Sequence, residues 1–311
     1  MKRLLTAGAF GMIMALSAPT SAFALDLGDD YAVRTFASPD PDSVNSHLIT
    51  TPNGVIVISA QRVESQALRA IERVKRIGKP VIAIVIPVPH TDHFGGLPTW
   101  RDAYPDAQVF AAEETITSMR TDGQGYVASR KNALGDDFPS QEEVNANLPT
   151  TVVGNDEEVS IDGITLRFVN LLENNAPVNT VVVLPEHQVM FSSELMEDGI
   201  SVFLKDATIE NWLSQLAALS TEYADIKIVF PAHGSSGPID ALVSETEQHL
   251  IMYQDGVDAA LADDGQVDDA EVAALTAQIE AAYPDFAQVA RVPRDALVSA
   301  NIKWQAARRA D

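Results

Sequence analysis

The 311-residue chain contains no cysteine, and this absence excludes several kinds of chemistry. Disulfide bonds cannot cross-link the fold, and a catalytic thiol or a thiolate metal ligand is equally excluded. Stability must therefore come from packing and from any bound metal. The sequence also lacks the Gly-x-Ser-x-Gly motif of serine hydrolases and the glycine-rich loops that bind phosphates or dinucleotides.

Basic residues are scarce. The chain has 21 lysines and arginines against 44 aspartates and glutamates, which gives a formal net charge of −23. Such a surface repels the phosphates of nucleic acids and anionic membranes. No basic stripe with interleaved aromatic residues is present either. We therefore expect a small-molecule partner and no nucleic acid, while the sequence leaves the oligomeric state open.

Long apolar runs are absent beyond the first residues. Lys2 and Arg3 precede an apolar run, Leu4–Ala18, and Ala22–Ala24 has the small-x-small pattern of a cleavage site. The run is too short and wrongly flanked for a stable membrane span. The pattern predicts a signal peptide over residues 1–24 and a periplasmic or secreted protein with no membrane anchor after cleavage.

The most informative stretch of the sequence is a histidine-rich loop. His90, Asp92 and His93 fall within four positions, directly after the apolar run Val81–Ile86 and before a glycine pair. Imidazole and carboxylate ligands together suit zinc or a similar divalent ion. The spacing matches the second half of an H-x-H-x-D-H metal motif, but Val88 occupies the first histidine position.

Strand and helix patterns alternate along the chain, and each half opens with a β-rich portion. Buried strands are predicted at residues 55–58, 81–86, 108–111 and 226–230. Helical spacing is predicted for residues 65–77, 113–120, 209–223, 239–262, 269–283 and 294–309. The alternation predicts an α/β fold, a four-layer αββα sandwich. We expect one domain over residues 25–240, with a helical part over residues 241–311 packed on it.

The segment 121–147 interrupts this pattern. It is polar, contains glycines and has few large apolar residues, which predicts a long surface excursion. Two interpretations remain open, a flap over a cleft and an ordinary mobile insertion.

Several stretches, taken in order, resemble the metallo-β-lactamase superfamily of hydrolases. The resemblance extends over essentially the whole chain after the signal peptide. It rests on residues 45–49, 54–58, 89–96, 179–183, 191–194 and 231–234. It implies an αββα fold and a centre of up to two metal ions with a bridging hydroxide, which attacks a carbonyl or phosphoryl group.

Within this resemblance, the second metal site keeps its ligands. Asp92, His93 and His233 match three of them, and Glu194 stands where the family usually has a bridging aspartate. Three protein ligands leave one zinc position open for water. Glu194 could also bind this metal or act as a base on its water.

The first metal site is degenerate in the same comparison. It keeps only His90, because its other two histidine positions hold Val88 and Asn175. An amide oxygen is a poor zinc ligand, so Asn175 would add little to this site. The aspartate expected to brace this site is Ser59. These departures favour one zinc ion over two.

Two functions follow as hypotheses. The first is an exported hydrolase of small esters, lactams or lactones, in which Asp92, Glu194 and His90 are the catalytic residues around a single zinc. The second is a binding protein on the same fold that has lost its dinuclear centre. The remaining histidines are predicted to be structural or solvated: His47, His187 and His249.

Overall fold

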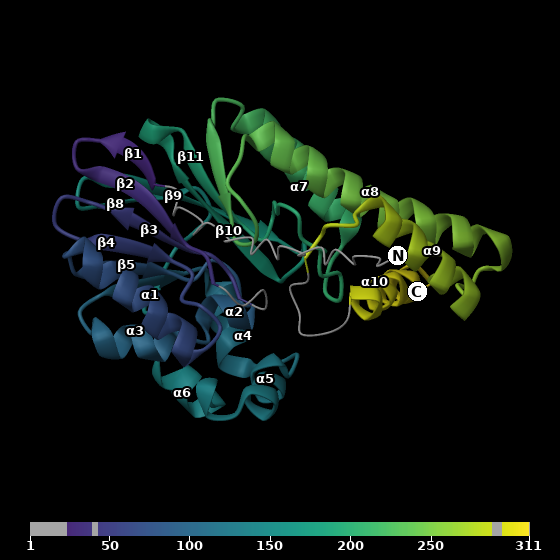
Figure 1. Cartoon of the computed structure of the whole chain (residues 1–311), viewed down its shortest axis with the longest axis horizontal. Helices are drawn as coiled ribbons and strands as arrows, with labels where there is room; N and C mark the ends of the chain where they lie inside the picture. Colours follow the sequence, from purple (N-terminus) through teal and green to yellow (C-terminus); the bar gives the residue numbers. More distant parts are fainter. Residues whose placement is uncertain (1–23, 39–42, 288–293, 311) are drawn as a thin grey trace, which may run out of the picture.

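The computed structural model describes residues 24–38, 43–287 and 294–310, and two β-sheets stacked face to face form its centre (Figure 1). The first sheet has seven strands, which lie side by side in chain order. They are β1 (Ala24–Gly28), β2 (Tyr31–Phe36), β3 (Ser46–Thr50), β4 (Val55–Ile58), β5 (Val81–Val85), β6 (Gln108–Ala111) and β7 (Thr151–Val152). Strands β1 to β4 pair antiparallel, and β4 to β7 pair parallel.

The second sheet has five strands in the order β12-β11-β10-β9-β8. They are β8 (Glu157–Ile161), β9 (Ile164–Leu172), β10 (Val178–Leu184), β11 (Val189–Ser193) and β12 (Ile228–Pro231). β10 and β11 form a hairpin, joined by the 3-10 turn η2 (Pro185–His187), and β12 pairs parallel to β11.

Helices cover the outer face of each sheet, so the four-layer prediction is confirmed (Figure 1). The first sheet is covered by α1 (Glu64–Ile77) and α3 (Leu97–Ala103), with α2 (Thr91–Phe94), α4 (Glu113–Thr121), α5 (Tyr126–Leu134), the 3-10 turn η1 (Gly135–Asp137) and α6 (Gln141–Ala146) at its end. The second is covered by α7 (Ile209–Glu222) and α8 (Ile239–Asp264), with α9 (Asp269–Ala282) and α10 (Arg294–Ala310) beside them.

The continuous apolar strands are explained by burial on both faces. Along β4, Ile56 and Ile58 point into the layer between the sheets, while Val55 and Val57 point toward the helices. Side chains alternate between the faces of a strand, so a strand buried on both faces needs apolar residues throughout. Gly78 ends α1 in the left-handed conformation, with φ of 77°.

Helices α5 and α6 correct the prediction for the segment 121–147. The segment is largely helical, and three buried apolar side chains attach it to the core around α3 and α4: Val127, Phe138 and Val144. Each helix is short and buries a single apolar side chain. The sequence therefore shows no helical period there, and the pattern alone predicts a loop.

The predicted domain limit between residues 240 and 241 falls in the first turn of α8, which begins at Ile239. Helices α7 to α10 share one apolar core with the second sheet. Apart from Ala24, the predicted signal peptide lies outside the described residues. Among the described residues, no helix is long and apolar enough to span a membrane.

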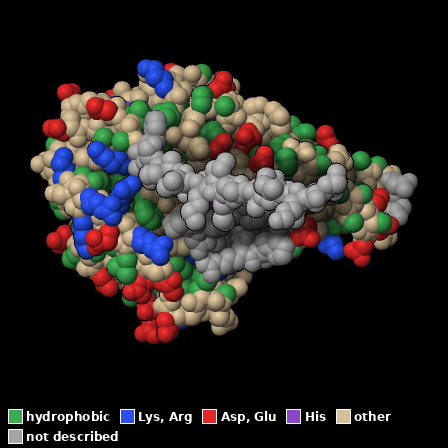
Figure 2. Space-filling model, in the orientation of Figure 1, with side chains coloured by type: hydrophobic (Ala, Val, Ile, Leu, Met, Phe, Trp, Pro, Cys, Tyr) green, Lys and Arg blue, Asp and Glu red, His purple; other side chains and the backbone are tan. Residues whose placement is uncertain are grey.

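Charge is unevenly spread over the face drawn in Figure 2. Acidic side chains are scattered around the described surface, while lysines and arginines gather at the end where α1 and the first strands lie. Arg73 and Arg76 of α1 line two surface hollows at this end.

The glycine pair after α2 lets the histidine loop lie against the end of β4. A Cβ atom at Gly95 would meet the carbonyl oxygen of Arg62 at 1.9 Å, and one at Gly96 would meet that of Ala60 at 2.3 Å. The backbone of Gly96 also donates to the carbonyl of Gln61, at 2.8 Å. Only glycine allows this approach.

We therefore expect Gly95→Ala to lower the free energy of unfolding by about 2 kcal/mol or more, because the contact is with rigid backbone. Urea denaturation of the two proteins would measure the change. Gly123→Ala is the matched control, because the nearest atom to its Cβ would be 3.8 Å away. A change below about 0.5 kcal/mol in Gly95→Ala would contradict this packing argument.

Candidate functional site

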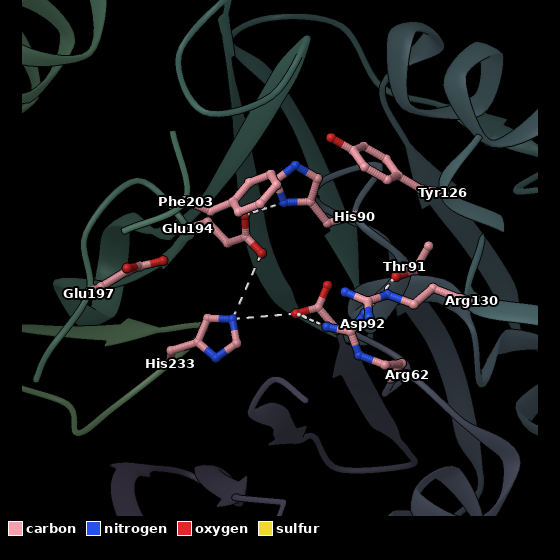
Figure 3. A pocket seen from close by; sticks show the side chains of 10 residues that line it. All are labelled: Arg62, His90, Thr91, Asp92, Tyr126, Arg130, Glu194, Glu197, Phe203 and His233. Carbon is pink, nitrogen blue, oxygen red and sulfur yellow. Dashed lines mark hydrogen bonds and ion pairs between the residues drawn. The ribbon is translucent and has the colours of Figure 1, made fainter. Parts of the chain in front are cut away.

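The ends of three strands bring the predicted site residues together (Figure 3). His90, Asp92 and His93 follow β5, Glu194 follows β11, and His233 follows β12. The carboxyl ends of neighbouring parallel strands are where such folds place their sites. All five predicted residues belong to one group, joined by hydrogen bonds and ion pairs.

The loop that presents His233 is fixed on both sides. The side chain of Asn45 donates to the carbonyls of Pro231 and Gly234, at 3.1 and 3.0 Å. Gly234 has φ of 83°, and a Cβ there would lie 2.0 Å from the carbonyl oxygen of Asp198. The position therefore requires glycine, and the imidazole before it is held in a single place.

Glu194 lies at the centre of the group and is 5% exposed. One carboxylate oxygen, Oε1, is 3.1 Å from Nε2 of His93 and 3.8 Å from Nε2 of His233. The other oxygen, Oε2, pairs with Nδ1 of His90 and accepts a hydrogen bond of 2.8 Å from the side-chain amide of Asn175. A buried carboxylate needs such partners, because desolvation penalises an unpaired charge.

The residues of the degenerate first metal site support Glu194. Asn179 donates to Oδ1 of Asn175 at 3.1 Å, so the amide nitrogen of Asn175 faces Glu194 and its oxygen faces Asn179. Val88 is fully buried. Asn175 and Asn179 together form a hydrogen-bonded support beside Glu194.

Ser59 supports a different residue from the one expected. Its hydroxyl is 2.8 Å from Nδ1 of His93. The sequence interpretation assigned Ser59 to the first site, whereas the structure places it behind a ligand of the second. A partner on Nδ1 orients the ring and leaves Nε2 directed toward Glu194 and Asp92.

Asp92 is held by a buried arginine and by His233. Nη2 of Arg62 lies 3.3 Å from Oδ2 of Asp92, and Nε2 of His233 lies 3.4 Å from the same oxygen. Burial would raise the pKa of Asp92, but the charge of Arg62 and the hydrogen bond with His233 hold it well below its usual range. Asp92 is therefore ionised, as a metal ligand must be.

The two histidines beside the carboxylates are protonated when no metal is bound. Burial opposes the charge on His90, but the neighbouring Glu194 raises its pKa to about 9. For His233, burial is likewise outweighed by hydrogen bonds to Asp92 and Glu194, and the pKa rises to about 10. Burial would raise the pKa of Glu194, and the charge of His90 with the histidine hydrogen bonds holds it well below normal.

The donor atoms fit a divalent metal. Asp92, His93 and Glu194 offer ligand atoms that all lie within 4.8 Å of one another. The distances between adjoining donors, including His233, are 3.1, 3.4 and 3.8 Å. Ligands of tetrahedral zinc with bonds of about 2.0–2.1 Å stand about 3.4 Å apart. The described residues could therefore hold a zinc ion without large movement.

A cavity opens beside this group. Besides Thr91, which lies within the histidine loop, five of its lining residues were not predicted from the sequence: Arg62, Tyr126, Arg130, Glu197 and Phe203 (Figure 3). Four of them belong to no recognisable site motif. Arg62 alone had a signal, because a charged residue follows the end of a buried strand by only four positions.

The other histidines take structural places. His47 is buried and fully bonded, to Thr35 and to the carbonyl of Pro231, and burial lowers its pKa to about 4. His249 is buried against the rings of Tyr253, Tyr283 and Phe286. His187 lies half-buried in the turn between β10 and β11.

Comparison with known proteins adds the family. The chain is 28% identical to the type 2 metallo-beta-lactamase of Bacteroides fragilis over 98 residues, which are 30% of this chain and 39% of that enzyme. It is 23% identical to the Bacillus cereus enzyme over 197 residues, which are 62% of this chain and 68% of that enzyme.

A solved metallo-beta-lactamase family protein of Thermus thermophilus has the same fold. The TM-score is 0.62 at 17% identity, and the match covers 90% of this chain and 94% of that one. The sequence profile of the metallo-beta-lactamase superfamily matches residues 39–233, which include the five predicted site residues. The chain therefore belongs to the metallo-beta-lactamase superfamily.

Proposed function

We propose that the protein is an exported hydrolase of small esters, lactams or lactones that works with a single zinc ion. The observation that carries this proposal is the group of three donors Asp92, His93 and Glu194, with Nε2 of His233 at 3.4 and 3.8 Å from the two carboxylates. The predicted signal peptide, residues 1–24, supports export. The family supports hydrolysis, and a cavity opens beside the donors.

The chain divides the work among a few residues. Asp92, His93 and His233 would hold the ion, which supplies Lewis acidity and an activated water. Glu194 directs one oxygen toward the same group, and its other oxygen is fixed by His90 and Asn175. This pairing allows His90 and Glu194 to share and pass a proton at the floor of the cavity.

A binding protein is the second candidate function. It is favoured by the ion pair between Arg62 and Asp92, which already neutralises one of the metal-ligand charges. Glu194 also fills the centre of the donor group, so that a fourth protein ligand takes the position that a catalytic zinc usually leaves open. In this case the cavity would recognise a small molecule without cleaving it.

Metal content and activity separate these functions. We expect the wild type to carry about one zinc per chain by mass spectrometry, and His93→Ala to carry almost none. Hydrolysis of chromogenic ester and lactam substrates should fall at least about 100-fold in His93→Ala and His233→Ala. His187→Ala, in the hairpin turn, is the matched control and should keep both properties.

Two zinc ions per wild-type chain would contradict the single-site proposal. Negligible zinc, with no hydrolysis of any substrate, would favour the binding protein. Activity that survives in both His93→Ala and His233→Ala would contradict the metal mechanism itself.

Ser59 offers a finer test of the donor set. Removing its hydroxyl in Ser59→Ala should weaken zinc binding by about 10- to 100-fold, because the ring of His93 loses its orienting partner. Competition with a zinc-chelating dye would measure the affinity. Ser65→Ala, at an exposed hydroxyl on α1, should bind zinc as the wild type does. Equal affinities in the two variants would show that Ser59 has no such role.

Glu197 is a further titratable group on the cavity wall. It is 6% exposed, and its Oε2 has no hydrogen-bond partner among the described residues. Burial raises its pKa to about 8, against a partial opposing effect of the positive charge of His233. Glu197 is thus a neutral carboxyl group at neutral pH, able to donate a hydrogen bond into the cavity.

This shift makes the metal-free protein less stable as the pH rises. The folded chain keeps the proton of Glu197 up to about pH 8, whereas an unfolded glutamate loses it near pH 4.5. The stabilising contribution is therefore complete below about pH 4.5 and is lost as the pH rises through 8.

Thermal unfolding of the metal-free protein between pH 5 and pH 8 would test this effect. Glu197→Gln cannot titrate, so its melting temperature should fall less over this range than that of the wild type. His90 and His233 are present in both proteins, and their contribution is the same in the two below about pH 8, where Glu197 is neutral. Glu222→Gln, at an exposed position of α7, is the control. Parallel curves for wild type and Glu197→Gln would contradict the assignment.

A further inference from the structure

One wall of the cavity is an irregular segment held by α10. Residues 201–207, here called the wall segment, lie between β11 and α7 and form neither helix nor strand. Asn301 of α10 accepts from the backbone NH of Leu204, at 2.9 Å, and donates to the carbonyl of Val202, at 2.7 Å. Gln305, one turn later, donates to the carbonyl of Leu204 at 2.9 Å.

These side-chain hydrogen bonds satisfy backbone groups of the wall segment, as strand pairing would do in a sheet. Asn301 and Gln305 are 0% and 1% exposed, so each buried amide is matched to a backbone group that would otherwise lack a partner. Val202 and Leu204 are buried in the core of the second sheet at the same time. The conformation of the wall segment is therefore set by α10.

An aromatic chain runs from α10 to the donor group. The ring of Trp304 meets the edge of Phe203 with centroids 5.4 Å apart, and Phe203 in turn contacts His90 at 6.2 Å, nearly perpendicular. Phe203 also lines the cavity (Figure 3). A rigid aromatic ring in this place limits how far an apolar group can extend beside His90.

The opposite wall is tied to the same segment. The hydroxyl of Tyr126, at the start of α5, donates to Asp206 at 2.5 Å, and Nζ of Lys205 lies 4.6 Å from the centre of the tyrosine ring. In Figure 3, Tyr126 and Phe203 lie on either side of His90. Two segments outside the paired sheets therefore give the cavity its aromatic walls.

We propose that Phe203 is the specificity-determining residue of this cavity, with α10 as its support. The preferred substrate is then a compact acyl compound whose short apolar group packs against Phe203 and Tyr126. This inference rests on the proposed hydrolase function. It goes beyond that function because α10 lies outside residues 39–233, where the family profile matches.

The test uses the zinc-loaded full chain and p-nitrophenyl esters of acetate, butyrate and hexanoate. We expect the wild type to prefer acetate. In Phe203→Ala, the ratio of kcat/KM for hexanoate to that for acetate should rise about tenfold, as it does when a pocket gains the volume of a few methylene groups. Trp304→Leu should shift the ratio in the same direction by a smaller factor, because Phe203 loses its support.

Phe36→Ala is the matched control, because Phe36 is half-buried on β2 and does not line this cavity. Zinc content and melting temperature are measured for each variant, and Trp304→Leu carries the test if Phe203→Ala does not fold. A ratio unchanged in the folded variants, or shifted equally in Phe36→Ala, would overturn the proposal.

A binding measurement separates this inference from the proposed function. The affinities of the free carboxylates acetate, butyrate and hexanoate are measured by calorimetry for wild type and Phe203→Ala. If no ester is cleaved, but hexanoate gains affinity in Phe203→Ala, the hydrolase proposal fails and the role of Phe203 stands. If the esters are cleaved but Phe203→Ala keeps the preference of the wild type, the hydrolase proposal stands and the role of Phe203 fails. Neither cleavage nor binding in any variant would overturn the role of Phe203.

Discussion

The buried carboxylate of Glu194 is the constraint on which the rest of the site depends. A charge taken out of water must be matched by positive groups and hydrogen-bond donors. Glu194 meets this need with His90, His93 and Asn175, which lie in segments that follow or join strands, His93 within the short helix α2. The two sheets bring these segments together at one end of the sandwich. Two residues that depart from the family motif belong to this arrangement, because Asn175 donates to the carboxylate and Ser59 contacts its partner His93.

A feature of this molecule could be predicted from the sequence when it depends on residues close together in the chain. It could not be predicted when it depends on contacts between distant residues. The strands and the long helices have apolar periods that depend on neighbouring positions, so the layers could be predicted. The site residues could be predicted because His90, Asp92 and His93 lie within one short motif. Helix α5 could not, since it buries only Val127. The role of Phe203 could not be predicted either, because its position depends on contacts with α10, about a hundred residues later in the chain.

The role of Ser59 shows a second limit. Its position at the end of β4 could be predicted, but the residue it touches depends on a close approach between two loops. That approach is set by the glycine pair after α2, which brings the histidine loop within backbone contact of residues 60–62. Motif spacing places a residue along the chain, whereas the packing of two backbones decides its partner.

Because α10 fixes the wall segment, the cavity cannot be completed before α10 has formed and docked. Residues 294–310 are synthesised after every strand of both sheets, so the two sheets can form before the helix that fixes Phe203 is available. Until α10 docks, the 201–207 backbone is without the side-chain amides that set its final conformation. The wall of the cavity that carries Phe203 is thus completed only when the last helix has docked.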